Sequence, residues 1–360
     1  FLRGIYARPI YNITLINEYL RECTDEKLAE RGITGADAED IRNTVAEVRF
    51  LRAFNYWVMM DLFGKSTFIT EANKIGAELP VEKGKEEIYA YVEEELKAIE
   101  NDLKAPRSNE YGRVDQAAAW SLLARLYLNA QTYIGTSKYT EAITYASKVI
   151  NSGYTLHPNY ARLFMADNDK ASDEIIYAIN CDGLRTQGYG NTTFFVHCAA
   201  GDDFADYGVS GGWYGYRATS ALVNKFADRT GATDSRAMFT TSAFGTSDAQ
   251  MVINDVGNFN EGPHVKKYVN LRSDGAPTND ITGVFADVDF PVFRLAEMYL
   301  IYAEAVLRGG TGGNRATALG YINQLRQRAY GTTSLGQVND TEMDLQFILD
   351  ERARELYWEG

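Results

Sequence analysis

The sequence predicts a mainly α-helical fold in which helical hairpins surround a large irregular region. Apolar residues recur at helical spacing over long segments near both ends of the chain. Residues 181–217, in contrast, contain eight glycines and eight aromatic residues and show no helical periodicity. We therefore expect a helical scaffold over 1–160 and 288–360, with a loop-rich, ligand-binding insertion over about 161–287.

The apolar spacing places helices at 41–63, 85–103, 114–130, 138–151, 290–307, 314–329 and 342–358. Gly64 and Pro106 mark the ends of the first two, because glycine favours helix termination and proline cannot continue a helix. The third and fourth helices form one hairpin, and the fifth and sixth form another. Similar small and aromatic residues occur at corresponding positions along the helices of both hairpins, which indicates tetratricopeptide-like units.

Charge and composition exclude several classes of partner. The net charge of −13 argues against a nucleic-acid partner. Cys23, Cys181 and Cys198 form no CxxC pair, and the three histidines are far apart in the sequence, so we expect no metal and no cofactor. Cys181 and Cys198 could form a disulfide in a secreted protein, but buried free thiols are the favoured interpretation.

Charged residues recur at helical spacing within very apolar helices. Charges in such surroundings are costly unless they are paired. The sequence therefore predicts one buried ion network that links Arg49, Arg52 and Arg294 to Glu297, Glu304, Glu351 and Glu355. Glu297 and Glu304 could alternatively be catalytic carboxylates, but their place on a core helix favours a structural role.

The aromatic residues of the insertion are candidates for a carbohydrate-binding surface. Exposed rings can stack on the C–H faces of sugars, while carboxylate, amide and guanidinium groups bind the hydroxyls. The alternative is a small core beneath long loops. The candidate ligand-binding residues are Trp213, Tyr214, Tyr216, Tyr189, Phe195, Tyr207, Asp203 and Arg217.

Four segments, in this order and at comparable separations, resemble the RagB/SusD family of glycan-binding lipoproteins. They are Ala46–Tyr56 with Asp61–Gly64, Gly112–Ala119 with Leu122–Leu128 and 146–153, Arg294–Ala305, and Leu349–Leu356 with the ending Trp358-Glu-Gly360. Together they cover most of the chain outside its variable loops. The resemblance implies a single SusD-like domain over 1–360.

The resemblance also implies a function. Family members capture oligosaccharides or other nutrients without catalysis, are lipid-anchored on the extracellular face of the outer membrane, and deliver their ligand to a SusC-like TonB-dependent transporter. They carry an acylated cysteine near the start and continue beyond the Glu-Gly at 359–360, neither of which this sequence shows. We therefore expect the chain to be truncated at both ends and the lipid anchor to be missing from it.

Two other functions remain open at this point. One is a glycoside hydrolase that uses Asp202, Asp203 or Asp206 beside the aromatic residues. The other is a protein-interaction scaffold that binds no small ligand.

Overall fold

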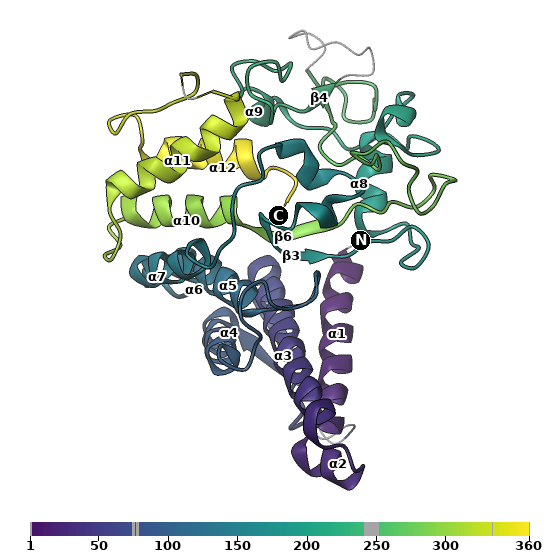
Figure 1. Cartoon of the computed structure of the whole chain (residues 1–360), viewed down its shortest axis with the longest axis vertical. Coiled ribbons are helices and arrows are strands. Elements are labelled where there is room, and N and C mark those ends of the chain that lie inside the picture. Colours follow the sequence, from purple (N-terminus) through teal and green to yellow (C-terminus); the bar gives the residue numbers. More distant parts are fainter. Residues whose placement is uncertain (1, 74–75, 77–78, 241–251, 333, 360) are drawn as a thin grey trace. The chain divides into compact units, whose positions relative to one another are not determined.

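The computed structural model describes residues 2–73, 76, 79–240, 252–332 and 334–359. Helices dominate this part of the chain, and its strands form three short two-stranded sheets (Figure 1). The prediction of a mainly α fold is confirmed. No helix among the described residues is long and apolar enough to cross a membrane. The chain divides into two compact units, one up to Gly153 with Gly309–Gly312, the other with the remaining residues from Tyr154.

The first unit is built from helices and one β-hairpin. Its helices are α1 (Leu2–Glu22), α2 (Asp25–Glu30), α3 (Gly35–Phe63), α4 (Lys85–Ile99), α5 (Gln116–Leu128), α6 (Ala130–Ile134) and α7 (Tyr139–Ile150). Strands β1 (Lys65–Phe68) and β2 (Val81–Gly84) are antiparallel and lie between α3 and α4 in the sequence.

The helix ends in this unit follow the expected chemistry. Gly64 ends α3 in the left-handed conformation, with a φ of 70° that glycine adopts without steric cost. Asp115 begins α5, because its carboxylate accepts a hydrogen bond from the amide of Ala118. Helices α5 and α7 pack together as the predicted hairpin.

The second unit contains the expected insertion together with the last three long helices. Its helices are α8 (Asn191–Ala199), α9 (Ser220–Val223), α10 (Leu295–Leu307), α11 (Arg315–Tyr330) and α12 (Leu345–Leu356). Its 3-10 turns are η1 (Tyr160–Phe164), η2 (Asn168–Ala171) and η3 (Phe204–Tyr207). Strand β3 (Ile175–Ile179) pairs with β6 (Phe290–Arg294), and β4 (Phe239–Thr240) pairs with β5 (His264–Val265), both antiparallel.

Two local predictions in this unit are wrong. Residues 290–294 form strand β6 instead of the first turn of a helix, because they pair with β3. Residues 191–199 form a regular helix, although the surrounding composition predicted loops. The predicted insertion at 161–287 belongs to the same compact unit as α10, α11 and α12.

The second predicted hairpin is present in this unit. Helices α10 and α11 pack together, and the rings of Tyr299 and Tyr321 stack with centroids 4.3 Å apart. Helix α12 packs against α10. The helical hairpins therefore match the tetratricopeptide-like pattern predicted from the sequence.

Candidate functional site

Two neighbouring aromatic rings are exposed beside helix α8. Tyr189 lies just before this helix and is 64% exposed, while Trp213 is 39% exposed. Their ring centroids are 5.8 Å apart and their planes are inclined by 52°. We call Tyr189 and Trp213 the ring pair. Large aromatic rings are usually well buried, so two exposed neighbours form a candidate ligand surface.

The ring pair is supported from behind by other rings. Phe285 lies beside Tyr189, with centroids 5.5 Å apart, and Phe194 of α8 lies 6.2 Å from Trp213. The imidazole of His197, also on α8, stacks on the indole of Trp213 at 4.4 Å and 18°. These contacts fix the orientation of the rings, which lowers the entropy lost when a ligand binds.

The segment that carries Trp213 is held along the end of α8 by backbone hydrogen bonds. The amides of Trp213, Tyr214 and Tyr216 donate to the carbonyl oxygens of His197, Ala200 and Cys198, at 2.8, 3.1 and 3.0 Å. These carbonyl groups belong to the last turn of α8 and to the residue that follows it, and the carbonyl groups at a helix C-terminus have no amide partner within the helix.

Gly212 makes this close approach possible. A Cβ atom at position 212 would lie 2.2 Å from the carbonyl oxygen of Gly201 and 2.6 Å from that of Ala200. Only glycine fits at this position without a backbone shift. Glycine at position 212 is therefore a structural requirement for the ring pair.

Three other predicted ligand-binding rings lie deeper. Tyr216 and Phe195 are partly buried, and each contacts Trp358, at 5.1 and 6.3 Å between centroids. Tyr207 is completely buried, and burial raises the pKa of its hydroxyl. Its predicted contact with ligand is wrong, because it belongs to the core beneath the loops.

The predicted polar candidates hold the loops themselves. The guanidinium of Arg217 donates to the carbonyl oxygens of Asn258, Glu261 and Val256 at 2.7, 2.8 and 2.9 Å. A carboxylate oxygen of Asp203 accepts from the amide of Gly201 at 2.9 Å. These bonds use part of the hydrogen-bonding capacity of both side chains. The role of Arg217 and Asp203 in ligand binding stays a prediction.

Tyr214 is partly exposed beside the ring pair. A hydrogen bond with Asp202 raises the pKa of its hydroxyl, because the phenol donates to the carboxylate. Asp202 is thereby tied to the same loop, and Asp206 lies 3.6 Å from the Lys266 ammonium. Each of the three carboxylates of the hydrolase alternative thus contacts another group of the second unit.

A buried ion network joins the end of α12 to β6. Arg294 is 1% exposed, and its guanidinium contacts the carboxylates of Glu174, Glu355 and Glu359 at 2.7, 2.8 and 2.5 Å. Arg328 also contacts both Glu174 and Glu355. Most of the lone pairs of these carboxylates are therefore satisfied, as buried charges require.

A second cation cluster surrounds the middle of α12. Glu351 is fully buried and contacts Arg236, Arg326 and Arg354 at 2.8, 2.8 and 2.7 Å. Burial alone would raise the pKa of the Glu351 carboxyl, but these three guanidinium groups lower it to about 2. Burial likewise opposes the shift at Glu355, whose pKa the surrounding arginines lower well below its ordinary value.

The predicted single network is wrong, because Arg49 and Arg52 belong to a separate one in the first unit. Arg49 contacts Glu95, while Arg52 contacts Glu95, Glu71 and the side-chain oxygen of Asn17. Both arginines project from α3 toward carboxylates on α4 and on the segment after β1. Their partners are thus close in the sequence to α3 rather than on α12.

The two glutamates of α10 have different surroundings. Glu304 lies 2.8 Å from Arg308, one turn along the helix, and 3.9 Å from Arg352. Glu297 is buried on the same helix. Neither lies at the ring pair.

Several members of the ion networks in the second unit were not predictable from the sequence. Arg236, Glu174 and Glu359 lie outside the helices with apolar spacing, so periodicity gave no signal for them. The one available signal was the pair Glu351 and Glu355, which required cations from somewhere else in the chain.

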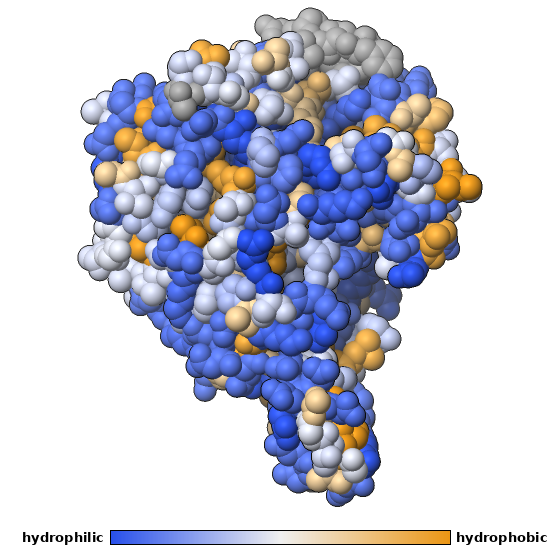
Figure 2. All heavy atoms as spheres, in the orientation of Figure 1, coloured by the Kyte–Doolittle hydropathy of each residue, from blue (hydrophilic) through white to orange (hydrophobic). Residues whose placement is uncertain are grey.

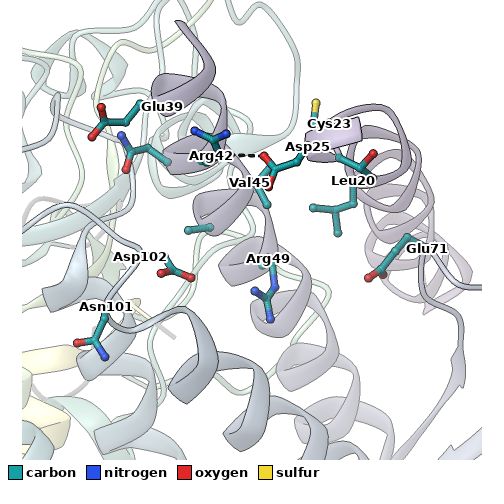
Figure 3. A pocket seen from close by; sticks show the side chains of 13 residues that line it. Leu20, Cys23, Asp25, Glu39, Arg42, Val45, Arg49, Glu71, Asn101 and Asp102 are labelled. Atoms are coloured by element: carbon teal, nitrogen blue, oxygen red, sulfur yellow. Dashed lines mark hydrogen bonds and ion pairs between the residues drawn. The ribbon is translucent and has the colours of Figure 1, made fainter. Parts of the chain in front are cut away.

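The first unit also contains a groove between α1, α2 and α3 (Figure 3). Its volume is about 680 Å³, and its lining consists of charged, amide, thiol and small or aliphatic side chains. Arg42 and Asp25 form an ion pair at 2.9 Å on its wall. It does not present aromatic faces like those of the ring pair.

Helical hairpins together with an exposed pair of aromatic rings on a loop-rich region are features of a ligand-binding protein. A model of the SusD family matches residues 239–360. Starch-binding protein SusD from Bacteroides thetaiotaomicron is 38% identical to this chain, over 99% of the chain and 68% of that protein. The chain belongs to the SusD family, whose members bind carbohydrate and are not catalysts.

Other relatives agree with this assignment. SusD-like protein P2 from Formosa agariphila is 27% identical over 93% of this chain and 66% of its own length. Surface glycan-binding protein A from Bacteroides uniformis has the same fold, with a TM-score of 0.70, 21% identity, and coverage of 100% of this chain and 72% of its own. This chain spans about two thirds of the length of the two sequence relatives.

Proposed function

We propose that this chain captures oligosaccharides by stacking sugar rings on Tyr189 and Trp213. The observation that carries the proposal is the exposure of two adjacent rings, 64% and 39%, on a rigid support. Their planes are inclined by 52°, so the two rings would suit successive sugars of a curved or twisted chain rather than of a straight one. The relatives support it, because their names describe starch binding and glycan binding.

The charge of the chain and the part of its surface shown in Figure 2 are compatible with a neutral, hydroxyl-rich ligand. On the face shown in Figure 2, hydrophilic residues predominate and hydrophobic ones form small patches. The acidic net charge of −13 does not repel a neutral sugar. In this proposal Tyr214, Asp203 and Arg217 offer hydrogen bonds to hydroxyls of the sugar. Tyr216 packs on Phe194, which lies beside Trp213, and Phe195 packs on Tyr216.

The proposed place of action is the extracellular face of the outer membrane. There the full-length protein would be held by a lipid anchor and would pass its ligand to a SusC-like TonB-dependent transporter. This part rests on membership of the SusD family. Co-purification of the full-length protein with the transporter tests it independently of ligand binding.

A glycan array tests the binding function directly. The chain should bind one class of neutral glycan, and Trp213→Ala should reduce the affinity about tenfold or more, equivalent to about 1.4 kcal/mol. Phe204→Ala is the matched control, because Phe204 is a similarly exposed ring of the same region, at 37%, outside the ring pair. Equal binding by the wild type and Trp213→Ala would contradict the proposal.

The same experiment addresses the scaffold alternative. A folded chain that binds no glycan on the array, but whose full-length form retains the transporter, would indicate a protein-interaction role. Incubation of the bound glycan with the protein should release no new reducing ends, since the family is not catalytic.

A further inference from the structure

His197 is a buried histidine whose two ring nitrogens both face carbonyl oxygens. Its Nδ1 lies 2.6 Å from the oxygen of Gly211, and its Nε2 lies 2.9 Å from the oxygen of Val284. A carbonyl oxygen can only accept a hydrogen bond, and a neutral imidazole has only one N–H. Both bonds can form together only when the ring carries two protons. The two contacts thus match the donor pattern of a doubly protonated ring.

The two carbonyl groups belong to the two loops that bear the candidate ligand surface. Gly211 is two residues before Trp213, and Val284 precedes Phe285, the ring on which Tyr189 packs. The side chain of His197 thus joins these loops to α8 at one point. It is 2% exposed, so water cannot readily replace either hydrogen bond.

His197 also contacts Trp213 directly. The two rings stack at 4.4 Å, and the carbonyl oxygen of His197 accepts the amide hydrogen of Trp213. A cation placed over the face of an indole is attracted by the ring's negative quadrupole. The backbone of His197 holds the backbone of Trp213 whatever the charge of the imidazole, and a doubly protonated ring would also attract the indole of Trp213.

We propose that His197 is a positioning residue whose doubly protonated form holds the ring pair in its ligand-binding arrangement. This inference rests on the proposed carbohydrate binding by Tyr189 and Trp213. When the ring loses one proton, a lone pair faces a carbonyl oxygen at 2.6 or 2.9 Å, and one loop must move away. Carbohydrate affinity should consequently be higher in mildly acidic solution than in mildly alkaline solution.

Most of the ionisable groups on the segments packed around His197 are acidic. Asp280 accepts from the amides of Val284 and Phe285 at 3.1 and 2.9 Å, which places its carboxylate on the Val284 side. The other such groups are Asp287 on the same segment, Cys198 on α8, and Asp202, Asp203 and Tyr214 on the segment that follows α8.

A first test needs no ligand. The chain has only three histidines, so their ring nitrogens can be followed individually by ¹⁵N NMR. At about pH 5.5 the ring of His197 should show two slowly exchanging N–H protons. The fluorescence of Trp213, obtained by subtracting the spectrum of Trp213→Phe from that of the wild type, should change when the His197 ring loses a proton. A ring with one proton throughout, and Trp213 fluorescence constant from about pH 5.5 to about pH 8, would overturn the inference.

A second test uses maltoheptaose as the probe. Wild-type affinity should fall about tenfold from about pH 5.5 to about pH 8, whereas His197→Gln should bind weakly and with no pH dependence, because an amide cannot donate in both directions. His157→Gln, at a partly exposed loop position outside the ring pair, is the control and should keep the wild-type profile. A wild-type profile in His197→Gln would overturn the inference.

The two proposals fail in different ways. If the wild-type protein bound neither maltoheptaose nor any glycan on the array at any pH, the proposed function would be refuted. The NMR and fluorescence measurements would then still decide whether His197 fixes Trp213. If His197→Gln does not fold, those two measurements on the wild-type protein decide the inference alone.

Discussion

Glu355 accepts hydrogen bonds from three different arginines while it is fully buried. Arg294 and Arg236 lie 2.8 and 3.1 Å from its carboxylate oxygens, and Arg328 contacts it too. Removing one partner from such a set leaves buried charge without compensation, whereas an exposed ion pair contributes little. The burial of each carboxylate therefore affects the stability of the fold more than the number of ion pairs does.

Replacement of Glu355 by Gln should lower the free energy of unfolding by about 3–5 kcal/mol, because it uncovers buried guanidinium charge. Glu304→Gln is the control, since its partner Arg308 has a side chain 38% exposed, and it should cost at most about 1 kcal/mol. Urea unfolding followed by circular dichroism measures both. Similar losses in the two variants would show that the buried network does not stabilise the second unit.

The lowered pKa of Glu351 predicts how stability depends on pH. Its pKa falls from an ordinary 4.5 to about 2 on folding, so the folded state binds fewer protons than the unfolded state between these values. This contribution is complete above about pH 4.5 and is lost as the pH falls toward about 2. Urea midpoints measured from about pH 6 downward should decrease in this window. A midpoint that stays constant to about pH 3 would contradict the prediction.

Some single residues could be predicted from the sequence and others could not. The spacing of Glu351 and Glu355 predicted buried partners, and these exist. Arg236 could not be named as one of them, because it lies in a loop more than a hundred residues away, where no period applies. Tyr207 illustrates the opposite error, since a ring in a glycine-rich loop can be completely buried.

At the scale of elements, the segment around Trp213 depends on its closeness to the end of α8. Gly212→Ala should displace this segment and weaken carbohydrate binding about tenfold or more, because the new methyl group would meet backbone oxygens at 2.2 and 2.6 Å. Gly211→Ala is a matched control, since nothing lies within 4 Å of its Cβ position. Titration calorimetry compares the two, and equal affinity would exclude a steric requirement at 212.

Elements with a strong local period were predictable, and those that depend on distant partners were not. The hairpin of α5 and α7 could be read from apolar spacing and a glycine turn. Strand β6 could not, because its extended form depends on pairing with β3, more than a hundred residues earlier. Helix α8 was hidden because glycines on both sides of it dominated the local composition.

At the scale of the whole molecule, each compact unit has its own buried ion network. Arg52 and Glu95 lie in the first unit, and Arg294 and Glu355 lie in the second. Local opening in a protein follows its cooperative units. The contacts that stabilise one unit can therefore be perturbed separately from those of the other.

Hydrogen exchange measured by mass spectrometry tests this division. Glu355→Gln should accelerate amide exchange in β6 and α12, and Arg52→Met should do so in α3 and α4, because each removes charges from one network only. The wild-type protein in the same buffer is the reference. Uniform acceleration over both units in either variant would show that they unfold together.

The composition of the chain could indicate a carbohydrate-binding region but not its geometry. Exposure of Tyr189 and Trp213 follows from the packing of two loops on α8, and neither ring differs in the sequence from buried neighbours such as Tyr207. The most direct measurement is a crystal structure of the chain with the glycan that binds most tightly on the array. We predict sugar rings stacked on Tyr189 and Trp213, and a glycan bound elsewhere, for example in the groove at Arg42 and Arg49, would contradict the account.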